Sequence, residues 1–510
     1  MTQSAPPSNR SSAPEPRKTE LFDAQRPAED AADVVAFPGS DELSAEQGEI
    51  LQQLRALVKD FYAAAPAQEF IPGESPVRLM LPSFDHREVT QAMESLLSTY
   101  ITLNQSSGNK IAAFEAGWSQ YIGSSNGVMV NSGSSANLLA LFMLRNPKIP
   151  GHLKPGDEII TPAVTWHTTV SPIIAAGCVP VLADVNLPRY TMDVEQVEKL
   201  ITPRTRALFP VHLLGNACDM DGLMALAERY GLWVIEDTCE AHGAEFRGHR
   251  AGSIGHIGTF SFFFSHHLTT MEGGMVVTDD DQLAELARIM RSQGVIRNTR
   301  RREELAAHYR QQPEVADFDP GFLFANLGFN LRPTELNGGF GLEQLKKFPQ
   351  FLETRRVNGR YWAQRMAGYG DLFHLPDPED HEGAWFSFPL TLRAGAPFSR
   401  EEIVNHLRGC GIETRPVMAG NVALQPAMQL FHHRSGDLPV AEHIHRHGFF
   451  WGNHQGICEA QRSYVADCVD DFIASHGARS STSVSGADLA RGDASAASSE
   501  ESEDSQRAAG

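Results

Sequence analysis

The middle of the chain alternates short apolar runs with stretches of helical spacing, and this alternation constrains the fold more than any other feature. The apolar runs predict buried strands at Ile159–Ile160, Val179–Val185, Ala207–Val211 and Leu232–Ile235. The stretches around them predict helices at Ala136–Leu144, Val194–Leu200 and Gly222–Tyr230. Such alternation is typical of an α/β fold with a mostly parallel, doubly wound sheet. Ligands bind these sheets beyond the carboxyl ends of the strands, so chemistry is expected there.

The pattern changes after Pro349, which predicts a second, smaller domain. Its expected elements are helices at Gln350–Met366, Arg400–Gly409 and Gln461–Ser475 and a strand at Trp385–Leu392. We therefore predict a C-terminal α+β domain over residues 350–478, and a large domain over 44–349 that starts with an amphipathic helix at Ser44–Ala65. The ends, 1–43 and 479–510, are predicted to be disordered, because they have too few large apolar side chains to offset the entropy of ordering.

Composition limits the classes of partner. The formal net charge of −20 argues against non-specific nucleic-acid binding, which relies on clustered Lys and Arg. No apolar run reaches the roughly 18 residues of a membrane-spanning helix, and Met1–Lys18 is polar. The six cysteines form no C-x-x-C pair, which fits a reducing compartment. We expect a cytoplasmic protein that binds a small molecule, without nucleic-acid or membrane partners.

The first motif is the Gly/Ser-rich turn Asn131–Ala136, which follows the apolar run Val128–Val130 and precedes a predicted helix. Backbone N–H groups and hydroxyls at a helix N-terminus bind anions, and phosphate is the natural occupant. The alternative interpretation is an ordinary N-capped helix.

The second motif is Val234–Asp237, where a carboxylate closes a predicted buried strand. An Asp in this position can keep a pyridine nitrogen protonated, because an ion pair in a partly desolvated site favours both charged forms. The alternative is an Asp that caps the following helix.

The third motif is Gly258–Thr278, in which an aromatic strand leads to a polar turn and a Gly-Gly bend leads into another strand. Together with the first two motifs, it resembles the DegT/DnrJ/EryC1/StrS family of sugar aminotransferases over about residues 83–475. The resemblance implies the type I aminotransferase fold, a pyridoxal phosphate (PLP) or pyridoxamine phosphate (PMP) cofactor, and a nucleotide-sugar substrate. It also implies a homodimer, because relatives build each active site from two subunits.

The same resemblance implies a set of cofactor-binding residues. They are Ser134 and Ser135 in the phosphate-binding turn, Trp166 stacked on the ring, Asp237 at the pyridine nitrogen, Glu240 near the ring hydroxyl where the family often has Gln, Ser261 at the phosphate, and Asn330 reaching a neighbouring subunit's cofactor.

The chain departs from the family at His266, which aligns with the lysine that links the cofactor covalently. Histidine cannot form that link, so the cofactor would be held non-covalently as PMP. This resembles the branch of 3-dehydratases that act on nucleotide-linked 4-keto-6-deoxysugars, with His266 as the base and Asp237 supporting it. After His266 the sequence lacks the four-cysteine iron–sulfur site of one subtype, which favours the subtype that regenerates PMP from glutamate.

Two further residues, His267 and Arg415, are expected to contact the substrate or co-substrate. The planar fork of Arg415 suits a glutamate or phosphate anion, and a structural arginine is the alternative.

Three other functions stay open. One is a true sugar aminotransferase that uses another base. A metal hydrolase is disfavoured, because the histidines lack H-E-x-x-H spacing and because His266 and His267 would face opposite sides of an extended segment. A non-catalytic sensor is disfavoured by the retention of Asp237 and Trp166.

Overall fold

A large sheet forms the centre of the fold in the computed structural model, which describes residues 43–66, 69–98, 101–102, 109–377 and 382–477. The expected disordered ends, 1–43 and 479–510, lie outside these ranges except for Leu43. The strands of the large sheet are β1 (Asn126–Val130), β2 (Glu158–Pro162), β3 (Val179–Ala183), β4 (Thr205–Leu208), β5 (Trp233–Asp237), β8 (Ile257–Ser261), β9 (Gly274–Thr278) and β13 (Arg434–Ser435).

Their order across the sheet is β1-β9-β8-β5-β4-β2-β3-β13, within the described residues. Strand β9 is antiparallel to both neighbours, and the other pairs of adjacent strands are parallel. The predicted α/β fold with a mostly parallel sheet is therefore confirmed. A small hairpin, β6 (Glu245–Phe246) with β7 (His249–Arg250), lies outside this sheet.

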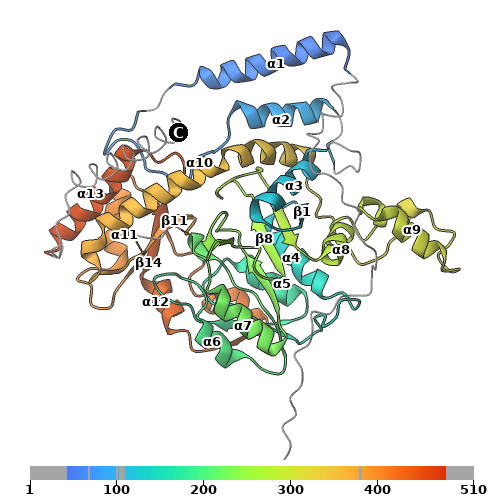
Figure 1. The fold of residues 1–510 in the computed structure, drawn as a ribbon. Coiled ribbons are helices and arrows are strands. Elements are labelled where there is room, and N and C mark those ends of the chain that lie inside the picture. Colours follow the sequence, from blue (N-terminus) through green and yellow to red (C-terminus); the bar gives the residue numbers. More distant parts are fainter. Residues whose placement is uncertain (1–42, 67–68, 99–100, 103–108, 378–381, 478–510) are drawn as a thin grey trace, which may run out of the picture.

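Helices cover both faces of the large sheet (Figure 1). They are α3 (Lys110–Ile122), α4 (Gly133–Leu144), α5 (His167–Ala175), α6 (Val194–Leu200), α7 (Met220–Tyr230) and α8 (Asp281–Arg291). Helix α9 (Arg302–Arg310) instead projects to the side of the sheet (Figure 1) and packs on the short turn at Ile296–Asn298. Consecutive side chains of a strand point to opposite faces. Accordingly Ile159 packs in one apolar cluster with α4, and Ile160 packs in another with α7. The expected strands and helices of this region occur within a few residues of their predicted bounds.

A second, antiparallel sheet lies towards the C-terminus in the order β10-β11-β14-β12. Its elements are β10 (Phe373–His374), β11 (Ser387–Leu392), β12 (Thr414–Pro416), β14 (Gly448–Gly452) and the helices α11 (Arg400–Gly409), α12 (Pro439–His447) and α13 (Glu459–Ser475). In its core Phe388 stacks on Trp451, and Trp362 meets both rings edge to face. The expected C-terminal helices and strand are present.

The long helix α10 (Glu335–Arg365) corrects one predicted element. The helix expected from Gln350 begins at Glu335, so Pro349 lies inside it. A proline in a helix interior costs about 3 kcal/mol. Tertiary packing outweighs this cost, because α10 packs on both α3 and α2 (His86–Leu97) before it reaches the small sheet. The proposed domain boundary at 349/350 therefore falls within a continuous helix, and the division into domains stays a prediction.

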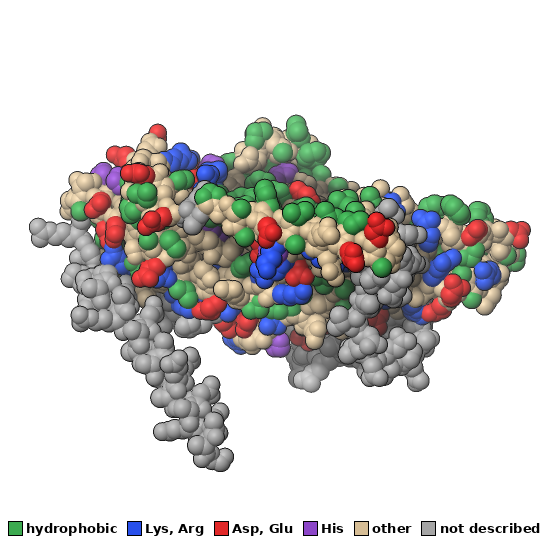
Figure 2. Space-filling view, turned by 90° about the horizontal axis from the view of Figure 1, so that it is seen from above, with side chains coloured by type: hydrophobic (Ala, Val, Ile, Leu, Met, Phe, Trp, Pro, Cys, Tyr) green, Lys and Arg blue, Asp and Glu red, His purple; other side chains and the backbone are tan. Residues whose placement is uncertain are grey.

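The predicted N-terminal helix is present as α1 (Ala45–Ala63), which starts with a capping box between Ser44 and Gln47. It lies against α2, where Arg55 pairs with Glu94. Figure 2 views the molecule from the α1 side and shows hydrophobic side chains along this face. None of the described helices is long and apolar enough to cross a membrane.

Candidate active site

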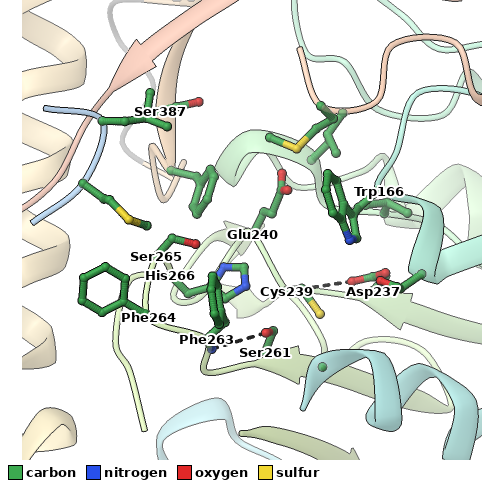
Figure 3. A pocket seen from close by; sticks show the side chains of 18 of the residues that line it. Trp166, Asp237, Cys239, Glu240, Ser261, Phe263, Phe264, Ser265, His266 and Ser387 are labelled. Carbon is green, nitrogen blue, oxygen red and sulfur yellow. Dashed lines mark hydrogen bonds between the residues drawn. The ribbon is translucent and has the colours of Figure 1, made fainter. Parts of the chain in front are cut away.

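A cavity of about 430 Å³ lies at the carboxyl ends of the strands of the large sheet (Figure 3), which is where ligands were expected. One wall follows β1, β2, β5 and β8, and the other comes from α10, β11, the segment after β14 and residues 79–81. Six of the ten expected site residues line the cavity: Ser134, Trp166, Asp237, Glu240, Ser261 and His266.

Asp237 ends β5 and is held by a network of hydrogen bonds. Its Oδ2 accepts hydrogen bonds from Asn137 Nδ2 and Thr169 Oγ1, both at 2.8 Å, and its Oδ1 accepts from the Cys239 N–H at 3.2 Å. Thr259 Oγ1 donates to Asn137 Oδ1 at 2.6 Å and so orients the amide. The carboxylate is buried and fixed in direction before any ligand binds.

Sequence reasoning missed these supporting side chains. Asn137 could have been found, because it is the only amide within the apolar helix α4. Thr169 and Thr259 carry no such signal, since threonine is common at helix starts and in strands.

The Gly/Ser-rich turn forms the N-terminus of α4. Ser132 caps the helix by accepting a hydrogen bond from the Ser135 N–H at 3.1 Å. A Cβ atom on Gly133 would lie 2.4 Å from Ser261 Cβ, so only glycine allows the helix to start this close to the end of β8. Ser134 and Ser261 therefore meet at one end of the cavity. Two hydroxyls and a helix N-terminus are the donor set that a phosphate requires.

His266 lies in the turn after β8, half-buried, and its Nδ1 is buried without a hydrogen-bond partner. Its ring centre is 5.6 Å from that of Phe386. Burial and the nearby Arg355 guanidinium lower the pKa of His266 to about 3, so the ring is neutral at physiological pH. A neutral imidazole with an unused nitrogen beside the cavity fits a bound ligand and can accept a proton.

Glu240 lines the cavity next to Asp237 and accepts a hydrogen bond from the Leu214 N–H at 3.1 Å. Burial raises its pKa to about 8, and the neighbouring Asp237 acts in the same direction. At neutral pH Glu240 is therefore a neutral acid, which can donate as well as accept a hydrogen bond. It resembles in this respect the Gln that often occupies this position in the family.

Trp166 is 60% exposed and stands at the mouth of the cavity. Its position after β2 suits an aromatic residue that stacks on a bound ring, and this role stays a prediction.

His267 corrects one expectation, since it does not reach the cavity. It is fully buried; its Nε2 lies 2.9 Å from the Ala384 carbonyl oxygen and its Nδ1 lies 3.3 Å from His242 Nδ1. The expected contact with substrate is therefore wrong. The physical reason is that the turn after β8 directs only His266 at the cavity, whereas His267 is held in the core by the Ala384 carbonyl oxygen and His242.

Three other expected residues lie outside the cavity. Ser135 is used in the cap of α4. Asn330 is exposed and accepts a hydrogen bond from Arg332 Nε. Arg415 is exposed on β12 and donates to the Thr414 carbonyl oxygen. Their roles stay predictions.

The set of basic side chains at the cavity is informative. Of the described residues that line it, none is a lysine and one is an arginine, Arg355 of α10. Sequence reasoning missed Arg355, because nothing in the local pattern of a polar helix face marks the residue that will meet a distant cavity. In the described part of the chain no group of three or more His, Cys, Asp or Glu side chains is arranged to hold a metal ion.

Known proteins resemble the chain at the level of both sequence and structure. The GDP-4-keto-6-deoxy-D-mannose 3-dehydratase of Yersinia pseudotuberculosis is 37% identical over 380 residues, which cover 73% of this chain and 93% of the relative. The dTDP-4-dehydro-2,6-dideoxy-D-glucose 3-dehydratase of Saccharopolyspora spinosa is 33% identical over 433 residues, 83% of this chain and 92% of the relative.

A solved structure of GDP-4-keto-6-deoxymannose-3-dehydratase with a trapped PLP-glutamate geminal diamine superposes with a TM-score of 0.69 and 31% identity, covering 77% of this chain and 99% of that chain. The expected type I aminotransferase fold is therefore confirmed. The DegT/DnrJ/EryC1/StrS aminotransferase family model matches residues 84–470, which is more than half of the chain. The chain belongs to the DegT/DnrJ/EryC1/StrS aminotransferase family.

Proposed function

We propose that this chain removes the C3 hydroxyl of a nucleotide-linked 4-keto-6-deoxyhexose, using PMP that glutamate regenerates. One observation carries the proposal: the cavity combines the family's cofactor-binding residues with His266, and no lysine is among the described residues that line it. Two relatives named as 3-dehydratases, and a solved structure with a PLP-glutamate adduct, support the same assignment.

The residues of the cavity fit the cofactor. Ser134, Ser261 and the N-terminus of α4 would hold the phosphate, Trp166 would stack on the ring, and Asp237 would hold the proton on the pyridine nitrogen. The orphaned Nδ1 of His266 is a buried polar group that a ligand would satisfy.

When bound, PMP supplies a primary amine and a ring that accepts electrons. His266 then moves the proton, because a neutral imidazole can both take a proton and deliver it to a leaving hydroxyl. Asp237 is fixed by three donors and need not reorient as charge develops. The aromatic rings of Phe263 and Phe386 lie beside the imidazole, with ring centres 6.5 and 5.6 Å from its own.

In the net reaction the C3 hydroxyl leaves and C3 is reduced, while glutamate is oxidised to 2-oxoglutarate with release of ammonia. The oxygen lost by the sugar appears in the keto acid through exchange with water, so atoms and electrons balance without a metal or an external reductant.

We also infer a cytoplasmic homodimer. All six cysteines are free, which suits a reducing compartment. Phe318, Phe322 and Phe324 are each more than half exposed, and an apolar surface of this kind suits a subunit contact. Asn330 lies outside its own cavity on the following segment, consistent with a role in a neighbour's site. Analytical ultracentrifugation tests the homodimer, and a monomer at micromolar concentration would contradict it.

The rival function is transfer of an amino group to the sugar, since the family is named for aminotransferases. The test incubates the purified full-length chain with PMP, glutamate and a panel of GDP-, CDP- and dTDP-linked 4-keto-6-deoxyhexoses, followed by mass spectrometry. We expect a product lighter by one oxygen atom, together with ammonia. A product that has gained an amino group would establish the rival. No turnover with any sugar would leave a sensor as the better assignment.

A further inference from the structure

Arg355 is a buried cation without an anionic partner. The residue is only 2% exposed. Among the described residues, no carboxylate lies within ion-pair distance of its guanidinium. Burial lowers its pKa to about 9, so it still carries its charge at neutral pH. A buried charge without a partner is strongly unfavourable. Such a group is expected where a ligand supplies the opposite charge.

The hydrogen bonds of Arg355 use one end of the guanidinium. Its Nη1 donates to the carbonyl oxygens of Phe386, at 2.9 Å, and Asn453. Its Nε is buried and has no partner, and no hydrogen bond of Nη2 to a described residue occurs. The Nε and Nη2 groups form one edge of the planar fork, which is the edge that binds a carboxylate through two parallel hydrogen bonds.

Arg355 lies across the cavity from the phosphate end. The phosphate end is built from α4 and β8, whereas both carbonyl partners of Arg355 belong to the segments around β11 and β14. Ser387, the first residue of β11, appears in Figure 3 on the far side of the cavity from Asp237 and Ser261. A single ligand phosphate cannot occupy both ends, so the cavity provides for two separate anions.

We propose that Arg355 binds a carboxylate of the amino donor, and so selects an amino acid as the compound that regenerates the cofactor. This inference rests on the proposed function. A carboxylate is favoured over the nucleotide diphosphate because the guanidinium is almost fully buried. A small planar anion fits such a position, whereas a nucleotide needs the open side of the cavity, where Trp166 is exposed. Asn453 Oδ1 and Ser387 Oγ are also buried without partners and offer further polar contacts to a ligand at this end.

The test measures binding of glutarate, a dicarboxylate without an amine, to the PLP-loaded full-length chain by isothermal titration calorimetry. In Arg355→Gln the glutarate Kd is expected to rise at least about 30-fold, because a charge-assisted double hydrogen bond is lost. The Kd for GDP is expected to stay within about threefold. Arg355→Lys keeps the charge without the fork and is expected to give an intermediate rise.

Arg356→Gln is the matched control. Arg356 is the next residue of α10, and its side chain also donates to two backbone carbonyls, those of Gly383 and Gly243. It does not line the cavity. Its glutarate Kd is expected to match that of the wild type. An equal loss of glutarate binding in both variants would show a structural role and overturn the proposal.

Two other outcomes would also overturn it: an unchanged glutarate Kd in Arg355→Gln, or a loss of GDP binding in place of glutarate binding. If the substitutions prevent folding, a glutarate-soaked crystal of the wild-type chain decides, since the carboxylate must lie within hydrogen-bond distance of Nε or Nη2. Dehydration of a nucleotide sugar by the PMP-loaded wild type needs no glutamate. It therefore tests the proposed function separately from the role of Arg355.

Discussion

On the wall of the cavity built from the large sheet, Asp237 receives three hydrogen bonds from neighbouring residues, whereas on the opposite wall Arg355 leaves its Nε without a partner. The difference extends to their surroundings. Asn137 beside Asp237 is itself oriented by Thr259, but Asn453 beside Arg355 has an unsatisfied Oδ1. The carboxylate of Asp237 is fully partnered before a ligand arrives, whereas the guanidinium of Arg355 keeps donors that a ligand can use.

The two walls therefore suit two different ligands, a cofactor that stays and a co-substrate that exchanges. A cofactor that stays through many turnovers is best held by groups that are already oriented, because no reorganisation is then needed. A co-substrate that enters and leaves in each cycle can use groups that lack partners in its absence. His266 lies between the two walls, and burial together with the Arg355 guanidinium lowers its pKa.

The largest expected effect comes from removing the group between the walls. His266→Ala should lower single-turnover dehydration by roughly 10²–10⁴-fold, which is the usual contribution of a general acid or base. The Kd for PLP should change little, because the phosphate and ring contacts lie on the large-sheet wall. Rapid-quench mass spectrometry and a PLP titration measure the two quantities. Turnover that is unchanged in this variant would remove His266 from the mechanism.

The next largest effect tests whether the large-sheet wall is complete by itself. Asp237→Asn should lower turnover by about 10²–10³-fold, because an amide cannot hold the proton on a pyridine nitrogen. Thr169→Val, which removes one of the three donors, should lower it by about tenfold. The same quench assay measures both variants, with circular dichroism as the folding control. Equal losses in the two variants would show that orientation, and not charge, is what Asp237 contributes.

A smaller effect concerns stability and pH. Glu240 has a folded pKa of about 8 against an ordinary value of 4.5. Below about pH 4.5 both the folded and unfolded chains keep this proton. Between pH 4.5 and 8 only the unfolded chain releases it, so stability falls as pH rises and levels off above pH 8.

The Glu240→Gln variant has no carboxyl group to ionise at this position, so it does not lose stability in this way as pH rises. The variant should be more stable than the wild type by roughly 1–3 kcal/mol at pH 8, and the difference should vanish near pH 4.5. Urea unfolding of the cofactor-free chain across this range measures it, with the exposed cavity residue Glu272→Gln as the matched control. A difference that is independent of pH would rule out the raised pKa as its cause.

The smallest effect on chemistry is expected at His267, the neighbour of His266 that faces the core. His267→Gln should lower the free energy of unfolding by about 1–2 kcal/mol, because the hydrogen bond to the Ala384 carbonyl is weakened. Single-turnover dehydration should stay within about threefold of the wild type. A large loss of turnover without a loss of stability would show that His267 acts on the substrate after all.

Much of the cofactor end of the site could be predicted from sequence. The turn that contains Ser134 and the carboxylate of Asp237 follow from local patterns, because the end of a strand and the start of a helix are local features, whereas Ser261 was expected only from the resemblance to the family. The contribution of Arg355 could not be predicted in the same way. It depends on α10 continuing through Pro349 and delivering a side chain to a cavity whose other residues are far away in the sequence.

The sequence by itself determined the alternation of strands and helices and the Gly/Ser-rich turn, since each is encoded within a few consecutive residues, and its resemblance to the family showed His266 in place of the lysine. Only the tertiary structure decided that His267 faces the core, that Glu240 is a neutral acid, and that Arg355 meets the cavity without a partner. These properties depend on burial and on neighbours from distant segments, and burial is created only when the chain packs.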